Sequence, residues 1–154
     1  MYKKILLAID NTADSKRAIE KVISLQKQFQ SRVSVFHTIS THVMPITNVG
    51  IMNLNYYPSR MQSTTEIVNS RRTAGEKLLQ KTAKMFKEQA APVDLRLIED
   101  ESPDDYILEA IEKEKFDLIV LGCEGHHSKL RRVLSDTVPD KVLNTAPVDV
   151  LIIR

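Results

Sequence analysis

The chain has no tryptophan, one cysteine, four glycines and no strong excess of either charge. A single thiol, Cys123, cannot build an internal disulfide framework, which is typical of a reducing, cytoplasmic compartment. The formal net charge of +2 provides no basic field for nucleic acid, and 42% hydrophobic residues are too many for a disordered chain. We therefore expect a folded cytoplasmic protein with no nucleic-acid partner.

Long apolar runs are also missing. No stretch reaches the roughly 18 apolar residues of a membrane span, and the apolar part of MYKKILLAID is too short for a signal peptide. We expect no membrane partner. The 154 residues fit one domain, 1–154, large enough to bury about two thirds of the surface of the unfolded chain.

Short apolar runs alternate with segments of helical periodicity along most of the chain. Because parallel strands need crossover connections, this alternation predicts an α/β fold: a Rossmann-like, doubly wound, five-stranded parallel sheet with about four helices. The unbroken apolar run 116–121 indicates a central strand, and the alternation in 93–97 an edge strand. The expected strands are 5–9, 33–39, 93–97, 116–121 and 148–153.

Helix starts are marked by capping residues. Thr12 is the expected cap of the first helix, Ser63 with Glu66 forms a capping box for the second, and Ser102 followed by Pro103 begins the third. The last helix is expected over 138–144. The predicted buried face of the second helix consists of Ala74, Leu78, Leu79, Ala83 and Phe86.

The segment 40–61 has no sustained period and is predicted to be a long loop or flap. Its many apolar side chains leave two interpretations open. They pack over a sheet edge or a dimer partner, or they form a lid over a ligand.

Gly122 and Gly125 follow the most apolar strand, and Asp10 ends the first strand. Open parallel sheets bind ligands beyond the carboxyl ends of their strands, so these residues are expected to face one crevice. Asp10 could accept hydrogen bonds from a ribose, and backbone N–H groups near Gly122, Gly125 and Thr137 could hold phosphate. The alternative is a tight turn at the glycines, with Asp10 and Thr137 serving only as helix caps.

Sequence motifs for other nucleotide-binding, catalytic or metal-binding sites are weak or absent. The first strand is followed neither by G-x-G-x-x-G nor by G-x4-G-K-[ST], and no Ser-His-Asp or paired-carboxylate arrangement can be argued. His126 and His127 are adjacent and make a poor metal pair, while His37 within a strand is interpreted as a core histidine with satisfied hydrogen bonds. Cys123 could be a reactive thiol, although Glu124 opposes a low thiol pKa. We predict no catalytic residue and no metal site.

Four segments together resemble the universal stress protein family: ILLAID, SPDDYI, DLIVLG-x2-G and KVLNTAPVDVLIIR. The resemblance covers nearly the whole chain. It implies a five-stranded α/β sheet of order 3-2-1-4-5 and a homodimer joined through the last strand, 148–153. In one branch of the family it also implies ATP or AMP bound by G-x2-G-x9-G-[ST]. ATP would be accompanied by Mg²⁺.

The resemblance also implies a nucleotide site. Asp10 matches the acid near the ribose or base, Thr38 falls where a backbone contact to adenine is usual, and Gly122 and Gly125 match the first two glycines of the motif. Thr137 matches its final hydroxyl residue. The complete implied site is Ala8, Ile9, Asp10, Thr38, Leu121, Gly122, Gly125, Ser135, Asp136, Thr137 and Val138.

This sequence departs from the family motif in ways that weaken phosphate binding. The third glycine is replaced by Ser135 or Asp136, depending on the alignment, and Glu124 stands between the first two glycines. Carboxylates near a triphosphate would repel it. The basic side chains between Lys129 and Arg132, and His126 or His127, either offset this repulsion or face water.

Three functions are therefore expected to compete. The leading hypothesis is a homodimeric, adenine-nucleotide-binding module of the stress response without fast turnover. The second keeps the fold and dimer but binds no ATP and acts as an interaction protein. The third is slow ATP hydrolysis or autophosphorylation at the glycine loop.

Overall fold

A computed structural model describes residues 1–42, 64–122 and 137–154. These residues form a five-stranded parallel sheet in the order β3-β2-β1-β4-β5, with four helices, which confirms the predicted fold class and strand order. The elements are β1 (Lys4–Ala8), α1 (Ala13–Phe29), β2 (Arg32–Ile39), α2 (Thr64–Glu88), β3 (Asp94–Glu99), α3 (Pro103–Glu114), β4 (Leu118–Gly122), α4 (Val138–Thr145) and β5 (Asp149–Ile153).

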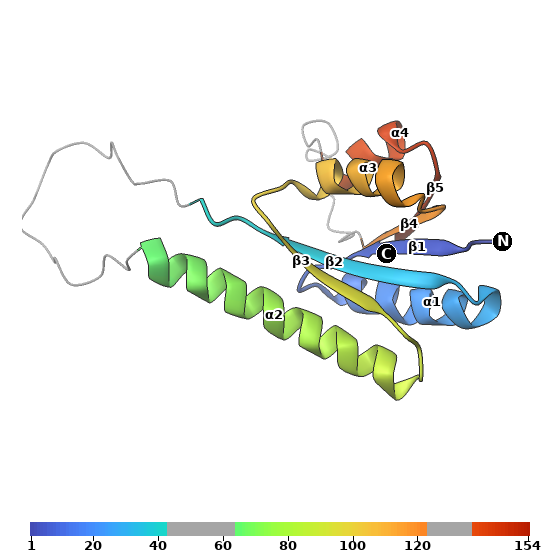
Figure 1. Ribbon diagram of the computed structural model, residues 1–154, viewed down its shortest axis with the longest axis horizontal. Helices are drawn as coiled ribbons and strands as arrows, with labels where there is room; N and C mark the ends of the chain where they lie inside the picture. The colour runs from blue at the N-terminus through green and yellow to red at the C-terminus, as the bar shows by residue number, and fades with distance from the viewer. Residues whose placement is uncertain (43–63, 123–136) are drawn as a thin grey trace, which may run out of the picture.

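The helices cover both faces of the sheet and divide the core in two. Helices α1 and α2 lie on one face and α3 and α4 on the other (Figure 1). In β1, Ile5 and Leu7 belong to the first core and Leu6 to the second, and all three are fully buried. An unbroken apolar run suits such a strand because both of its faces are covered. The middle strand is β1, and the equally apolar β4 lies beside it.

The predicted capping residues begin three of the helices. Thr12 Oγ1 accepts a hydrogen bond from Ser15 N at 3.2 Å, and Ser102 Oγ accepts one from Asp105 N at 3.3 Å. Thr137 caps α4 in the same way. The caps satisfy N–H groups that have no partner within the helix. Ser63 and most of the segment 40–61 lie outside the described residues.

The prediction for the buried face of α2 was partly wrong. Ala74 is exposed, and Gly75 is buried in its place, along with Leu79, Thr82 and Phe86. A Cβ atom on Gly75 would lie only 2.8 Å from Leu97 Cδ1, so the helix comes closest to the sheet at this glycine. A prediction from apolar periodicity assigns alanine to the buried face and ignores glycine. Here α2 approaches β2 and β3 so closely that the glycine faces the sheet and the alanine faces solvent.

Strand β3 is an edge strand, as its alternating pattern predicted. Its Arg96 donates to Glu114 Oε2 at 2.9 Å and to the hydroxyl of Tyr106 at 2.9 Å, both on α3. The hydrogen bonds from Arg96 lower the pKa of the Glu114 carboxyl. This charged cluster ties the edge of the sheet to the helix above it.

Within the described residues, no helix combines the length and the apolar character that crossing a membrane requires.

Candidate functional site

The strand order reverses between β1 and β4, so the candidate site lies at their carboxyl ends. Ala8 pairs in register with Phe36 of β2 on one side and with Leu121 of β4 on the other. Asp10 follows β1 by two residues, Thr38 follows Phe36 by two, and Gly122 follows Leu121 directly. The sheet thus brings together residues that are more than 80 positions apart in the sequence. This edge is where open parallel sheets bind ligands.

Asp10 is exposed at this edge, and one of its carboxylate oxygens is already engaged. Oδ1 accepts hydrogen bonds from Thr12 N at 3.1 Å and from the hydroxyl of Ser15 at 2.5 Å. Within the described residues, no hydrogen bond reaches Oδ2. Asp10 therefore stabilises the start of α1 through one carboxylate oxygen.

Ser15 positions Asp10, and sequence reasoning missed it. This serine is buried, and its Oγ accepts a hydrogen bond from Asp10 N at 2.8 Å in addition to donating to the carboxylate. The only signal for it in the sequence was a hydroxyl residue three positions after the cap Thr12. Ser15 locks both the backbone and the side chain of Asp10 in place.

The backbone of Ile9 joins the end of β1 to β2. Ile9 is 5% exposed, its N–H donates to Phe36 O at 3.0 Å, and its carbonyl oxygen lies 2.8 Å from Nδ1 of His37. His37 is therefore a half-buried histidine with a hydrogen-bond partner, as predicted. Ala8 and Thr38 are half-buried at the ends of β1 and β2. The backbone groups of Ile9 hold the strands together and are occupied by these bonds.

Gly122 packs against the first turn of α1. A Cβ atom at this position would lie 2.8 Å from Ser15 N and 2.9 Å from the carbonyl carbon of Asp14. Backbone atoms cannot give way as a side chain can, so the approach of β4 to α1 requires glycine here. Leu121 before it is buried in the second core. The first glycine of the predicted loop thus has a packing role that the sequence did not disclose.

Thr137 and Val138 begin α4, which packs on the face of the sheet opposite to α1. Thr137 accepts a hydrogen bond from Asp140 N at 3.4 Å and donates one to Asp140 Oδ2 at 2.6 Å. Val138 is half-buried and packs against the second core. The predicted site residues Gly125, Ser135 and Asp136 lie outside the described residues, as do Cys123, Glu124, His126, His127 and the basic residues from Lys129 to Arg132.

A second polar cluster lies at the ends of β2 and β3. Asp100 Oδ1 accepts hydrogen bonds from Thr41 N at 2.6 Å and from His42 Nδ1 at 3.0 Å, and Oδ2 accepts one from the Thr41 hydroxyl. The hydrogen bonds from Thr41, helped by His42, lower the pKa of Asp100 to about 2. Arg71 of α2 donates to the carbonyl oxygen of Ser40 at 2.8 Å. These bonds fix the direction in which the chain leaves β2.

The Asp100 cluster predicts a loss of stability in acid. Because the pKa of Asp100 in the folded state lies below its value of about 3.9 in an unfolded chain, its contribution is present above about pH 4 and is lost as the pH falls toward 2. Urea unfolding of the wild type and of Asp100→Asn between pH 6 and pH 2 measures this contribution. Asparagine tolerates the φ of 60° at this position. We expect the wild type to be more stable at pH 6 and the difference to shrink below pH 4; a difference independent of pH would contradict the assignment.

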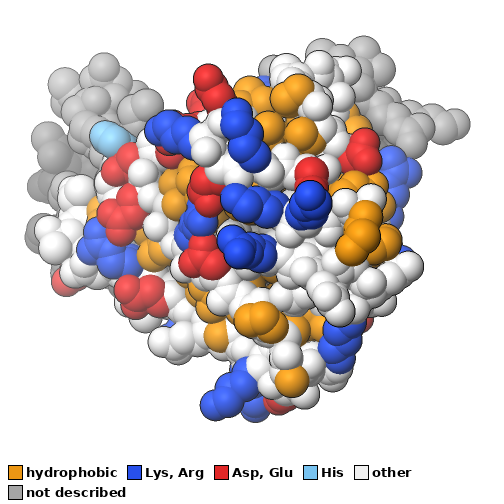
Figure 2. Space-filling view, turned by 45° about the vertical axis from the view of Figure 1, so that its right-hand side comes forward, with side chains coloured by type: hydrophobic (Ala, Val, Ile, Leu, Met, Phe, Trp, Pro, Cys, Tyr) orange, Lys and Arg blue, Asp and Glu red, His pale blue; other side chains and the backbone are white. Residues whose placement is uncertain are grey.

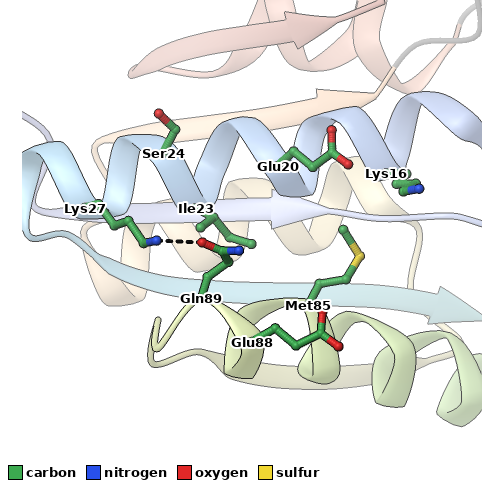
Figure 3. A pocket seen from close by; sticks show the side chains of 8 residues that line it. All are labelled: Lys16, Glu20, Ile23, Ser24, Lys27, Met85, Glu88 and Gln89. Carbon is green, nitrogen blue, oxygen red and sulfur yellow. Dashed lines mark hydrogen bonds between the residues drawn. The ribbon is translucent and has the colours of Figure 1, made fainter.

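A separate groove runs between α1 and α2 (Figure 3). Its volume is about 630 Å³, and Ile23 and Met85 provide its apolar part. At one end of the groove, Lys27 Nζ donates a hydrogen bond to Gln89 Oε1 at 2.7 Å, so these two polar groups bind each other. The groove contains none of the predicted site residues. Its lining residues are Lys16, Glu20, Ile23, Ser24, Lys27, Met85, Glu88 and Gln89.

Metal-binding chemistry finds no support in the described part of the chain, where no three His, Cys, Asp or Glu side chains converge on one point. The arrangement at the strand ends instead offers hydrogen-bond acceptors from Asp10 and a helix start at Thr137. These groups suit the ribose and phosphate of a nucleotide.

Comparison with known proteins places the chain among relatives of one kind. The model of the universal stress protein family matches residues 1–154. A universal stress protein of Methanocaldococcus jannaschii is 28% identical over 100% of this chain and 83% of its own length. Among solved structures, a universal stress protein of Archaeoglobus fulgidus in complex with dAMP has a TM-score of 0.64 at 16% identity, covering 99% of this chain and 98% of that one. A family protein of Arabidopsis thaliana with AMP bound has a TM-score of 0.65 at 15% identity, covering 98% and 90%.

Proposed function

The chain belongs to the universal stress protein family, and on that premise we propose that it binds an adenine nucleotide in the crevice where β1 and β4 end. The proposed ligand is AMP, or ATP together with Mg²⁺. The AMP and dAMP held by two structures of the same fold support an adenine nucleotide as the ligand.

The observation that carries this proposal is the position of Asp10. Its side chain is exposed just after β1, at the point where the strand order reverses, and the neighbouring strands β4 and β2 end close by, at Gly122 and just after Thr38. A carboxylate oxygen accepts hydrogen bonds from ribose hydroxyl groups, and Ser15 holds this one in a fixed orientation. The start of α4 at Thr137 provides the partial positive charge for phosphate.

We propose that the protein acts as a cytoplasmic homodimer in the stress response, joined through β5. This strand lies at the edge of the sheet, and its residues from Val150 to Ile153 are apolar and half-buried, which suits pairing with a second copy. A monomeric mass at micromolar concentration in sedimentation would contradict the dimer.

A second candidate is an interaction protein of the same fold that binds no nucleotide. Two observations favour it: Asp10 Oδ1 already accepts hydrogen bonds from Thr12 and Ser15 at the start of α1, and the Thr137 hydroxyl caps α4. A site that has become purely structural would keep these bonds and lose the ligand.

Calorimetric titration of the full chain with AMP and with ATP plus Mg²⁺ tests the proposal. Asp10→Asn keeps an acceptor for Thr12 and Ser15 and removes the charge. Hydrogen bonds to charged groups contribute about 1.5–3 kcal/mol, so we expect the affinity for the bound nucleotide to fall by about 10- to 100-fold.

Asp117→Asn is the matched control. Asp117 also accepts hydrogen bonds from backbone N–H groups, those of Lys3 at 2.8 Å and Lys4 at 3.0 Å, but it lies at the amino ends of the strands. Its replacement should leave nucleotide affinity within about threefold of the wild type. If the wild type gives no heat at millimolar nucleotide and copurifies with none, the interaction-protein candidate replaces the proposal.

A further inference from the structure

The two helical layers carry opposite charge. Helices α1 and α2, on one face of the sheet, together contain ten Lys and Arg residues and five Asp and Glu residues. Helices α3 and α4, on the other face, contain two Lys residues and six Asp and Glu residues. At the lower edge of Figure 2, on the side where α2 lies in Figure 1, Lys and Arg side chains (blue) project into solvent. The net charge of +2 hides this asymmetry because it sums over both layers.

The lysines beside the groove between α1 and α2 are available to a partner. Lys16 and Lys27 lie at its two ends (Figure 3). Lys81 precedes Met85 by four residues, so it extends the same side of α2 by one turn. All three lysines are exposed. Within the described residues, Lys16 and Lys81 form no ion pair, and Lys27 donates only to the neutral Gln89.

The centre of the groove is apolar and has carboxylates beside it. Ile23 of α1 is 6% exposed, and Met85 extends from α2 toward α1 with Glu20 and Glu88 on either side of it (Figure 3). Lys84 lies 3.9 Å from Glu88, whereas Glu20 forms no ion pair with any residue that the structure describes. The groove therefore presents a pattern of charges, with lysines at the ends and carboxylates in the middle, rather than a uniform positive field.

The length of the groove suits a short helix. Its lining on α1 runs from Lys16 to Lys27, a distance of about 16 Å at 1.5 Å per residue, or three helical turns. An amphipathic helix laid into an apolar groove is a recurrent mode of recognition, and a flexible methionine adapts well to such a partner.

The charge pattern distinguishes a helix from a uniform polyanion. Lipid headgroups or nucleic-acid phosphates would bring negative charge to Glu20 and Glu88 as well as to the lysines, and like charges repel. A helix can instead place apolar side chains in the middle of the groove and direct its carboxylates to the lysines at the ends and on the rim.

We propose that the groove between α1 and α2 binds an acidic amphipathic helix of a partner protein. The apolar stripe of this helix packs on Ile23 and Met85, and its flanking carboxylates pair with Lys16, Lys27 and Lys81. The groove contains none of the residues assigned to the nucleotide, so this inference is independent of nucleotide binding.

Fluorescence anisotropy of the full chain with a labelled synthetic helix of about 16 residues tests the proposal. The probe has leucines at helical spacing along one face and glutamates on both sides of them, and a control probe has lysine in place of every glutamate. At 0.1 M NaCl we expect the glutamate probe to bind at least about tenfold more tightly than the lysine probe. The difference should shrink at 1 M, because the Debye length falls from about 10 Å to about 3 Å. Equal binding of both probes, or no binding of the glutamate probe up to about 0.5 mM, would overturn the proposal.

Charge reversal tests whether the probe occupies this groove. Lys16→Glu combined with Lys81→Glu should weaken binding of the glutamate probe at least about tenfold, because two attractions become repulsions. Lys113→Glu is the matched control: it makes the same change of charge on α3, at an exposed lysine on the opposite face of the sheet. Its affinity should stay within about twofold of the wild type. Unchanged affinity in the double variant, with its fold intact by circular dichroism, would refute the site.

Met85→Gln tests the apolar part of the groove. We expect about fivefold weaker binding at both salt concentrations, because the lost contact is not electrostatic. Leu143→Gln, which changes a 52% exposed leucine on α4, is the control and should bind the probe like the wild type. Wild-type affinity in Met85→Gln would show that the helix does not enter the groove, which would also overturn the proposal.

Two measurements at 0.1 M NaCl test other occupants of the same face. They are cosedimentation with phosphatidylserine vesicles and sedimentation velocity of the chain alone. We expect neither vesicle binding nor self-association that depends on Lys16 and Lys81. Vesicle binding abolished by Lys16→Glu with Lys81→Glu would assign the face to a lipid surface, and assembly abolished by this variant would assign it to the acidic α3 of a second copy. Either result would overturn the proposed helix of a partner protein.

Discussion

Replacement of Gly122 by alanine is expected to lower the free energy of unfolding by about 2–3 kcal/mol, the upper part of the range for an overpacked core. The added Cβ atom would lie 2.8 Å from Ser15 N and 2.9 Å from the carbonyl carbon of Asp14, both backbone atoms of the first turn of α1. To relieve this contact, β4 or α1 must move, and Ser15 would move with it. Urea unfolding at neutral pH measures the change in stability.

Gly75→Ala is the matched control, because it adds the same atom at a similar distance from a different kind of neighbour. The nearest atom is Leu97 Cδ1 at 2.8 Å, the end of a side chain that can change rotamer. Alanine also stabilises a helix interior by about 1 kcal/mol relative to glycine, which offsets the crowding. We expect a net change within about 1 kcal/mol of zero. If Gly122→Ala were as mild as Gly75→Ala, α1 would not be tightly packed on β4.

Phe36→Ala is expected to cost about 3–5 kcal/mol, the usual range for a buried phenylalanine. The Phe36 side chain is 1% exposed, and its ring centroid lies 4.6 Å from that of Tyr106 on α3. Its carbonyl oxygen accepts the hydrogen bond from Ile9 N at the end of β1. Because domains of this kind have a total stability of about 5–15 kcal/mol, this single cavity should make the variant marginally stable at 37 °C.

Phe36→Leu separates the loss of volume from the loss of the aromatic contact. Leucine fills most of the cavity, so we expect this variant to lose only about 1–1.5 kcal/mol, part of it from the contact with Tyr106. Equal losses in the leucine and alanine variants, measured by urea unfolding, would show that the ring contact rather than cavity formation sets the stability.

The sequence by itself determined the order and type of the elements. Apolar runs, helical spacing and the capping residues Thr12 and Ser102 depend on neighbours a few positions away, so they can be recognised without tertiary contacts. The pattern therefore predicted the five strands and the edge position of β3, while their order in the sheet was expected from the family resemblance. The resemblance of four segments, ILLAID among them, led to the family that the comparisons bear out.

Only the tertiary structure decided what individual residues do at the site. It placed Ser15 against Asp10, turned Gly75 rather than Ala74 toward the sheet and pressed Gly122 onto the backbone of α1. These contacts join elements that are not adjacent in the sequence or depend on how closely a helix approaches a strand, and no local pattern encodes either.

The gathering of acidic helix starts depends on both the sequence and the fold. Each helix acquires an acid in its first turn for a local reason, the direction of its own dipole, and this is visible in the sequence at Asp104 or Asp140. The parallel topology then brings the helix starts to the carboxyl ends of the strands, which no local pattern encodes.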